Sequence, residues 1–124
     1  MFNINNDLDY FTKEEFDCQY SGENEMSDDL LLAVDLLRQK CGFPFVITSG
    51  YRSKDHPIER EKEKAGTHAQ GIAADIKVTD GTQRYKIVEE AIKMGFTGIG
   101  IAGSFVHVDI RDLDGNESPV MWTY

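Results

Sequence analysis

Two short segments of the chain carry the residue types that bind a borderline metal ion. The first segment, residues 68–75, begins with His68 and ends with Asp75, and the second, residues 105–109, has His107 at its centre. Zinc accepts imidazole nitrogens and carboxylate oxygens, and three protein ligands leave one position of a tetrahedral site open. A water at the open position can be activated as a nucleophile. The pattern therefore indicates a catalytic metal site and not a structural one.

Alternation of side chains supports this grouping. If residues 71–78 form a strand, Asp75 lies opposite the apolar face made by Ile72, Ala74, Ile76 and Val78. In residues 105–111 the same alternation places His107 and Asp109 on one face, away from Val106, Val108 and Ile110. The two candidate ligand segments thus each present a polar face.

Spacing requires a fold in the backbone between His68 and Asp75. Seven extended residues would span roughly 23 Å, whereas two ligands of one zinc ion lie within about 4 Å of each other. Gly71 is the expected position of this fold, because glycine adopts turn conformations without steric cost.

Each of these residues also has an ordinary structural interpretation. A lone histidine is more often a hydrogen-bonded polar residue than a ligand, and an aspartate often marks only the polar side of a strand. Two of the three histidines, however, lie on or beside strand patterns with a carboxylate on the same side. This joint occurrence favours a shared metal site. The third, His56, falls in the charged run 54–64 and is expected to be an exposed loop residue.

Two helices are predicted to support the site. Ser27 is the expected N-cap of the first, which carries a wide apolar stripe and ends before Gly42. Thr82 is the expected N-cap of the second, which ends at Gly95. A capping box at 12–15 predicts a short helical turn near the start of the chain.

Short strands complete the predicted fold. They are expected at 45–48, 71–78, 98–102 and 105–111, with a tight turn at 103–104 and another turn at 112–116. The pattern predicts one α+β domain over residues 1–124: a small antiparallel sheet, helices mainly on one side, and the metal site at the end of the sheet.

Composition limits the possible partners. The chain has 124 residues and a net charge of −9, which argues against nucleic-acid binding because phosphate contacts need a basic surface. No segment has the length of a membrane span, and the N-terminus lacks a signal-peptide pattern. We therefore expect synthesis in the cytoplasm, reduced Cys18 and Cys41, and a monomer.

Three motifs, in this order, resemble the signatures of the D-alanyl-D-alanine carboxypeptidase (VanY-type) zinc peptidases, a family that includes phage L-alanyl-D-glutamate endolysins, murein endopeptidases and the hedgehog-like fold. They are Ser49-Gly50-Tyr51-Arg52-Ser53, His68-x-x-Gly71-x-Ala73-x-Asp75 and Phe105-Val106-His107-Val108-Asp109. The resemblance implies zinc held by His68, Asp75 and His107, with Ser49 and Arg52 in the substrate cleft.

One position departs from the carboxypeptidase pattern. Many members place an acidic general base three residues before the final histidine, where this chain has Ser104. A serine cannot take a proton from a metal-bound water at neutral pH. Asp109 is the best local candidate for the base. Its alternative role is a carboxylate that orients His107 or pairs with Arg111.

The resemblance implies a zinc metallopeptidase acting on peptidoglycan stem peptides, as a carboxypeptidase or an endopeptidase. It would reach the wall after release by lysis, as an endolysin does, or as part of a virion. Three alternatives stay open: a non-catalytic zinc-binding interaction domain, a metallohydrolase acting on a small D-amino-acid peptide, and a virion or cell-wall structural protein with a vestigial site.

Overall fold

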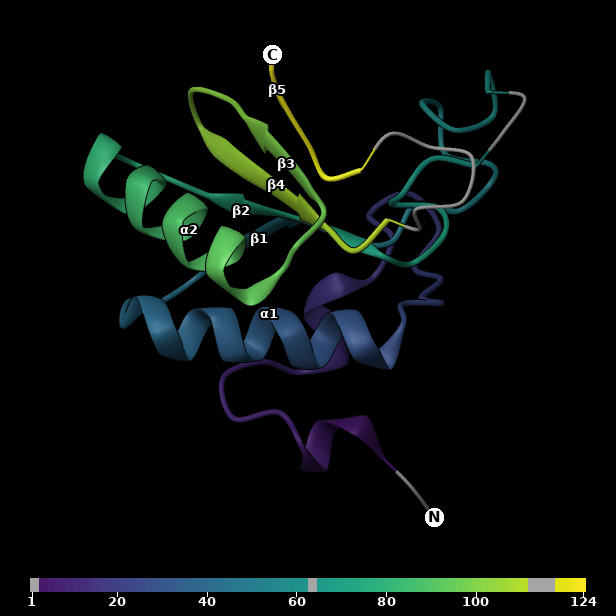
Figure 1. Cartoon of the computed structure of the whole chain (residues 1–124). Helices are drawn as coiled ribbons and strands as arrows, with labels where there is room; N and C mark the ends of the chain where they lie inside the picture. The colour runs from purple at the N-terminus through teal and green to yellow at the C-terminus, as the bar shows by residue number, and fades with distance from the viewer. Residues whose placement is uncertain (1–2, 63–64, 112–117) are drawn as a thin grey trace.

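The computed structural model describes residues 3–62, 65–111 and 118–124. Figure 1 shows α1 and α2 packed on the same side of a twisted sheet, with the long loop that leads into β2 at one end. The predicted α+β class is thereby confirmed. The turn expected at 112–116 lies outside the described residues.

Helix α1 spans Asp28–Cys41 and α2 spans Gly81–Met94. Ser27 caps α1 by accepting a hydrogen bond from the backbone N–H of Leu30, and both helices end at a glycine in the left-handed region. The predicted cap of α2 was wrong. Asp80, not Thr82, caps it, because the Asp80 carboxylate accepts from the N–H of Gln83 at 2.8 Å.

The start of the chain forms two short 3-10 helices, Ile4–Asn6 and Lys13–Phe16. The helical turn expected after Thr12 is therefore present, but Thr12 makes no side-chain capping hydrogen bond. A four-residue 3-10 turn does not reproduce the N-terminal geometry of an α-helix on which a capping box depends.

The sheet contains five strands: β1 (Ile47–Ser49), β2 (Ala73–Lys77), β3 (Gly98–Ile101), β4 (Phe105–Asp109) and β5 (Val120–Thr123). Their order is β1-β2-β4-β3-β5, and every pairing is antiparallel except the parallel pairing of β3 with β5. Strand β4 lies at the centre, between β2 and β3. The candidate ligands Asp75 and His107 are therefore carried by two adjacent strands that each pair with a neighbour on both edges.

Alternation along the central strands separates the core from the site. Ala74 and Ile76 of β2 and Val106 and Val108 of β4 are fully buried and belong to the hydrophobic core, together with apolar side chains of α1 such as Leu30, Val34 and Leu37. The intervening residues project from the opposite face. The metal site was expected at the end of the sheet; it lies instead on this second face, in the middle of β2 and β4.

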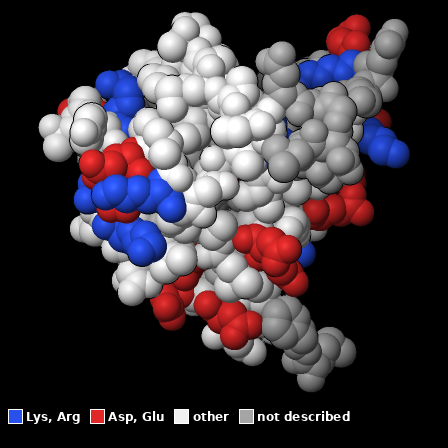
Figure 2. Space-filling view, in the orientation of Figure 1, with Lys and Arg blue, Asp and Glu red and all other residues white. Residues whose placement is uncertain are grey.

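Lysine and glutamate side chains on the surface of α2 form ion pairs within the helix. Figure 2 shows Lys or Arg side chains beside Asp or Glu where α2 reaches the surface. Lys86 lies 3.3 Å from Glu90, and Lys93 lies 3.9 Å from Glu89. None of the helices described is both long and apolar enough to cross a membrane.

Candidate metal centre

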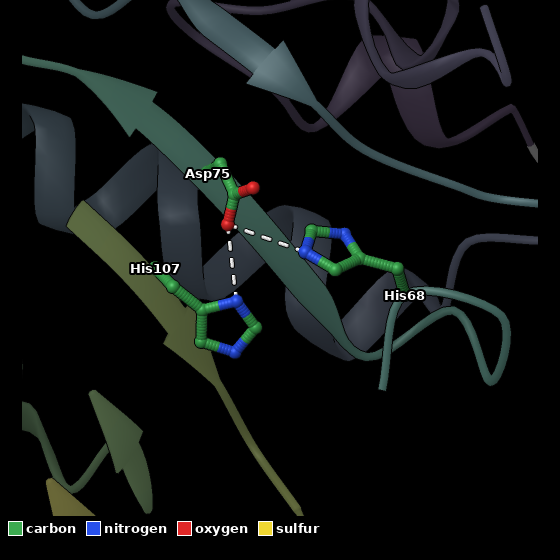
Figure 3. Close-up of side chains that lie close together, drawn as sticks. All are labelled: His68, Asp75 and His107. Atoms are coloured by element: carbon green, nitrogen blue, oxygen red, sulfur yellow. Dashed lines mark hydrogen bonds and ion pairs between the residues drawn. The ribbon is translucent and has the colours of Figure 1, made fainter. Parts of the chain in front are cut away.

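His68, Asp75 and His107 converge on one point above the sheet. The Oδ1 atom of Asp75 lies 3.2 Å from Nε2 of His68 and 3.0 Å from Nδ1 of His107. Figure 3 shows the two rings turned toward this oxygen, with the helices behind the strands. All three side chains are buried, and their ligand atoms lie within 4.8 Å of one another.

A turn and two close backbone contacts position His68. Gly71 adopts φ = +76°, and its N–H closes the turn by donating to the carbonyl of His68 at 3.2 Å. Nδ1 of His68 lies 2.7 Å from the carbonyl oxygen of Gly50. Residue 50 has to be glycine, because a Cβ there would collide with the backbone of Phe16. The fold expected at Gly71 is thus present, and the Gly50 carbonyl fixes the ring of His68.

Asp109 fixes the ring of His107 from the opposite side. Its Oδ2 atom lies 2.7 Å from Nε2 of His107 and accepts a hydrogen bond from Nη2 of Arg111, also at 2.7 Å. The carboxyl group is fully buried, and it fits only because residue 98 is glycine. This geometry favours the orienting role for Asp109 over the predicted role of general base, because the carboxylate faces away from the convergence point.

The hydrogen bonds on the outer nitrogens test whether the site fits a cation. A carbonyl oxygen and a carboxylate only accept, so Nδ1 of His68 and Nε2 of His107 have to be the donors. In the neutral tautomers, the lone pairs of both rings then point at Oδ1 of Asp75. Three lone pairs facing one another repel unless a cation or protons lie between them. The residues therefore fit a metal ion.

The electrostatics of the metal-free site agree with this fit. Burial alone would raise the pKa of Asp75, but hydrogen bonds and charge from both histidines lower it far below its ordinary value. Burial lowers the pKa of His107, yet its bonds to Asp109 and Asp75 raise it overall. Burial raises and the bonds from His107 and Arg111 lower the pKa of Asp109, to about 2.

Trp122 closes the far side of His107. The indole ring lies 5.0 Å from the ring of His107, and the guanidinium of Arg111 stacks 4.9 Å above the indole. A Cβ at Gly100 would lie 2.7 Å from this indole. Gly98 and Gly100, the two glycines of β3, therefore provide space beside the site for Asp109 and Trp122.

A cleft of about 360 Å³ opens beside the three ligands. It is lined by Arg52, Ile58, Glu59, Lys62, Thr67, His68, Asp75, Phe105, His107 and Tyr124. One wall carries the charges of Arg52, Glu59 and Lys62, and another is aromatic. The Nη2 atom of Arg52 lies 3.8 Å from Oδ2 of Asp75, the oxygen farther from the histidines. The site can therefore combine a metal ion with a permanent cation.

The structure brings most of the predicted residues together. Arg52 joins the three ligands, whereas Ser49 lies in β1 opposite Asp75 and does not line the cleft. His56 stays in its loop, where Nδ1 accepts from the N–H of Ile58. Cys18 and Cys41 are free thiols.

Sequence reasoning missed the Gly50 carbonyl, and it considered Glu59 only as a charged-loop residue that could take the proton if Asp109 did not. A single sequence does not show which carboxylate of a charged run is buried, because the neighbouring residues are charged as well and no apolar periodicity marks the buried position. Gly50 did have a signal, since it lies inside a motif already singled out.

Comparison with known proteins agrees with the site. Residues 9–109 match the family model Peptidase M15, and the chain belongs to this family of D-Ala-D-Ala carboxypeptidase-like metallopeptidases. No curated protein matches the chain. Arg111, Trp122 and Tyr124 lie beyond the matched residues.

Proposed function

We propose that the chain is a zinc-dependent peptidase that hydrolyses a peptide bond in peptidoglycan stem peptides. One observation carries the proposal. The hydrogen bonds at Nδ1 of His68 and Nε2 of His107 leave the lone pair of the other nitrogen of each ring directed toward Asp75, beside a cleft that Arg52 also lines. Membership of the Peptidase M15 family supports the reaction class.

Zinc would be held by Nε2 of His68, Oδ1 of Asp75 and Nδ1 of His107, where it supplies a Lewis acid and lowers the pKa of a bound water toward about 7. The residues of the chain have separate tasks. Asp109 keeps the proton of His107 on Nε2 and so presents Nδ1 to the site. Trp122 restricts rotation of the same ring and excludes solvent from it.

Arg52 acts on the substrate. A guanidinium stays protonated and has no lone pair for a metal, so it can only donate hydrogen bonds. It suits the oxygen that gains charge during peptide hydrolysis, or a free carboxylate of the substrate. Lys62 lines the same cleft, where its ammonium group is paired with Glu59. In a protein that is strongly acidic overall, Arg52 is thus the cation that we expect an acidic peptide to contact.

Digestion of purified peptidoglycan, analysed by mass spectrometry with and without a chelator, tests the proposal. We expect chelator-sensitive release of stem-peptide fragments. Loss of a terminal D-alanine would identify a carboxypeptidase, and cleavage inside the stem would identify an endopeptidase. Intact peptidoglycan after incubation with zinc-loaded protein would refute the proposal. The protein would reach the cell wall after release by lysis or as part of a virion.

A non-catalytic zinc-binding domain is the second candidate. It is favoured by Ser104, which occupies the position of the family's usual acidic base and lies exposed in the turn between β3 and β4. Such a domain would bind zinc and a stem peptide without releasing fragments. The digestion experiment separates the two functions.

A further inference from the structure

Glu59 is an unusual residue for its surroundings. It lies in the highly charged segment 54–62, yet its side chain is only 2% exposed. Oε2 accepts a hydrogen bond from Nζ of Lys62 at 2.9 Å, and Oε1 accepts one from the N–H of Gly66 at 3.1 Å. Burial alone would raise the pKa of Glu59, but these two bonds lower it. Glu59 is therefore a buried carboxylate that is ionised at neutral pH.

This carboxylate and the candidate ligand Asp75 lie beside different terminal nitrogens of the Arg52 guanidinium. Nη1 of Arg52 lies 4.0 Å from Oε2 of Glu59, while Nη2 lies 3.8 Å from Oδ2 of Asp75. Both distances are within the range of an ion pair but longer than a hydrogen bond. The guanidinium is therefore close to two negative charges, and within residues 3–62, 65–111 and 118–124 no acceptor takes a hydrogen bond from its N–H groups, which can bind another molecule.

The backbone around Arg52 is already fixed. Its N–H donates to the carbonyl of His68, and the neighbouring N–H groups of Tyr51 and Ser53 donate to Phe16 and to the sulfur of Cys18. What remains to be positioned is the long side chain, which has several rotatable bonds and a large conformational entropy.

Asp75 alone cannot hold that side chain once a divalent cation is bound. Its charge is then shared with the cation, and the cation itself repels the guanidinium. A second carboxylate beside Arg52 that does not belong to the ligand group offsets this repulsion. Glu59 has this place, and its low exposure limits screening by solvent and salt.

We propose that Glu59 is a positioning residue that holds the Arg52 guanidinium in the cleft beside a bound divalent cation. The inference rests on the proposed peptidase function. Its consequence is that the charge of Glu59 contributes to hydrolysis only through Arg52.

A double-mutant cycle on zinc-loaded protein tests this. Glu59→Gln keeps the size and the acceptor for Gly66 but removes the charge. We expect kcat/KM for stem-peptide hydrolysis to fall roughly tenfold, with the zinc content unchanged. In an Arg52→Lys background the same substitution should cost little more. Glu59→Asp, which retains the charge, should recover part of the loss. Glu61→Gln, an exposed change in the same segment, is the matched control and should have no effect.

A second readout does not depend on activity. Rotation of the Arg52 guanidinium about its Nε–Cζ bond can be followed by nitrogen NMR, with the signal assigned by its loss in Arg52→Lys. We expect rotation to be faster by about threefold or more in Glu59→Gln. Unchanged rotation, or an undiminished effect of Glu59→Gln in the Arg52→Lys background, would overturn the proposal. If the wild-type protein hydrolyses nothing, the peptidase function fails, and the rotation measurement alone decides the role of Glu59.

Discussion

Asp75 and His107 are direct partners in the register of the adjacent strands β2 and β4, and Oδ1 of Asp75 lies 3.0 Å from Nδ1 of His107. Two of the three metal ligands are therefore placed by backbone pairing. Only His68 comes from a loop, whose position depends on the turn at Gly71 and the carbonyl of Gly50.

Removal of either histidine should remove the metal. We expect about one zinc ion per chain in the purified protein and almost none in His68→Ala or His107→Ala, because two remaining ligands bind zinc weakly. Elemental analysis of the dialysed proteins measures this. His56→Ala is the control, since His56 lies outside the ligand group. Full zinc occupancy in either ligand variant would rule out the assigned site.

Arg52→Lys should separate metal binding from catalysis. Zinc content should stay at the wild-type level, because Arg52 does not supply a ligand atom. Hydrolysis should fall by roughly two orders of magnitude, since a point charge replaces a planar fork of donors. Steady-state kinetics on stem peptides checks this. Wild-type rates in this variant would remove Arg52 from the mechanism.

Asp109→Asn distinguishes the two roles considered for Asp109. If the carboxylate orients His107, zinc affinity should fall by about 10- to 100-fold, and thermal stability should fall too because Arg111 loses its buried partner. If Asp109 were the general base, zinc affinity would be nearly unchanged while turnover collapsed. Zinc titration and thermal denaturation of the same preparation decide between them.

Zinc affinity should decrease as the pH falls. The metal has to displace the proton from Nδ1 of His107, whose pKa is raised in the metal-free protein by Asp109 and Asp75 despite the opposing effect of burial. Competition by protons therefore begins at a higher pH than for an ordinary histidine. Calorimetric zinc titrations over a pH series measure the onset. In Asp109→Asn the onset should shift to lower pH; an unshifted onset would contradict this coupling.

Gly98→Ala should destabilise the fold. A Cβ at this position collides with the Asp109 carboxylate, which cannot move without breaking its bonds to His107 and Arg111. We expect a loss of about 1–3 kcal/mol, together with reduced zinc binding. Chemical denaturation measures the loss. Gly103→Ala is the matched control, because among the described residues no atom beyond its chain neighbours lies within 4 Å of the added Cβ, and stability should be unchanged.

Local rules predicted much of this fold. The cap at Ser27, the helix end at Gly42 and the alternation around His107 each follow from interactions within a few residues. The cap expected at Thr82 lies instead at Asp80, and local pattern alone does not separate the two, because both residue types cap helices well and the positions are only two residues apart. The length of a strand and the neighbour with which it pairs depend on residues far away in the sequence. The parallel pairing of β3 with β5 therefore had no local signal.

The chemical roles were harder to predict than the ligand set. Whether Asp109 is a base or an orienting carboxylate depends on which ring nitrogen of His107 it contacts, and this is set by a side-chain rotation that spacing does not specify. The burial of Glu59 arises because Lys62 and Gly66 fold back on it, within a run whose composition indicates a solvated surface.

The two glycines of β3 restrict how the sequence of this protein can diverge. Gly98 leaves space for the carboxylate at 109, and Gly100 leaves space for the indole at 122. A homologue with a larger residue at either position would have to shorten the side chain opposite it in the same lineage. Substitutions at these positions are therefore expected to occur in pairs, 98 with 109 and 100 with 122. Neither glycine has a side chain that could contact the metal ligands, so this restriction comes only from the space that each glycine leaves empty.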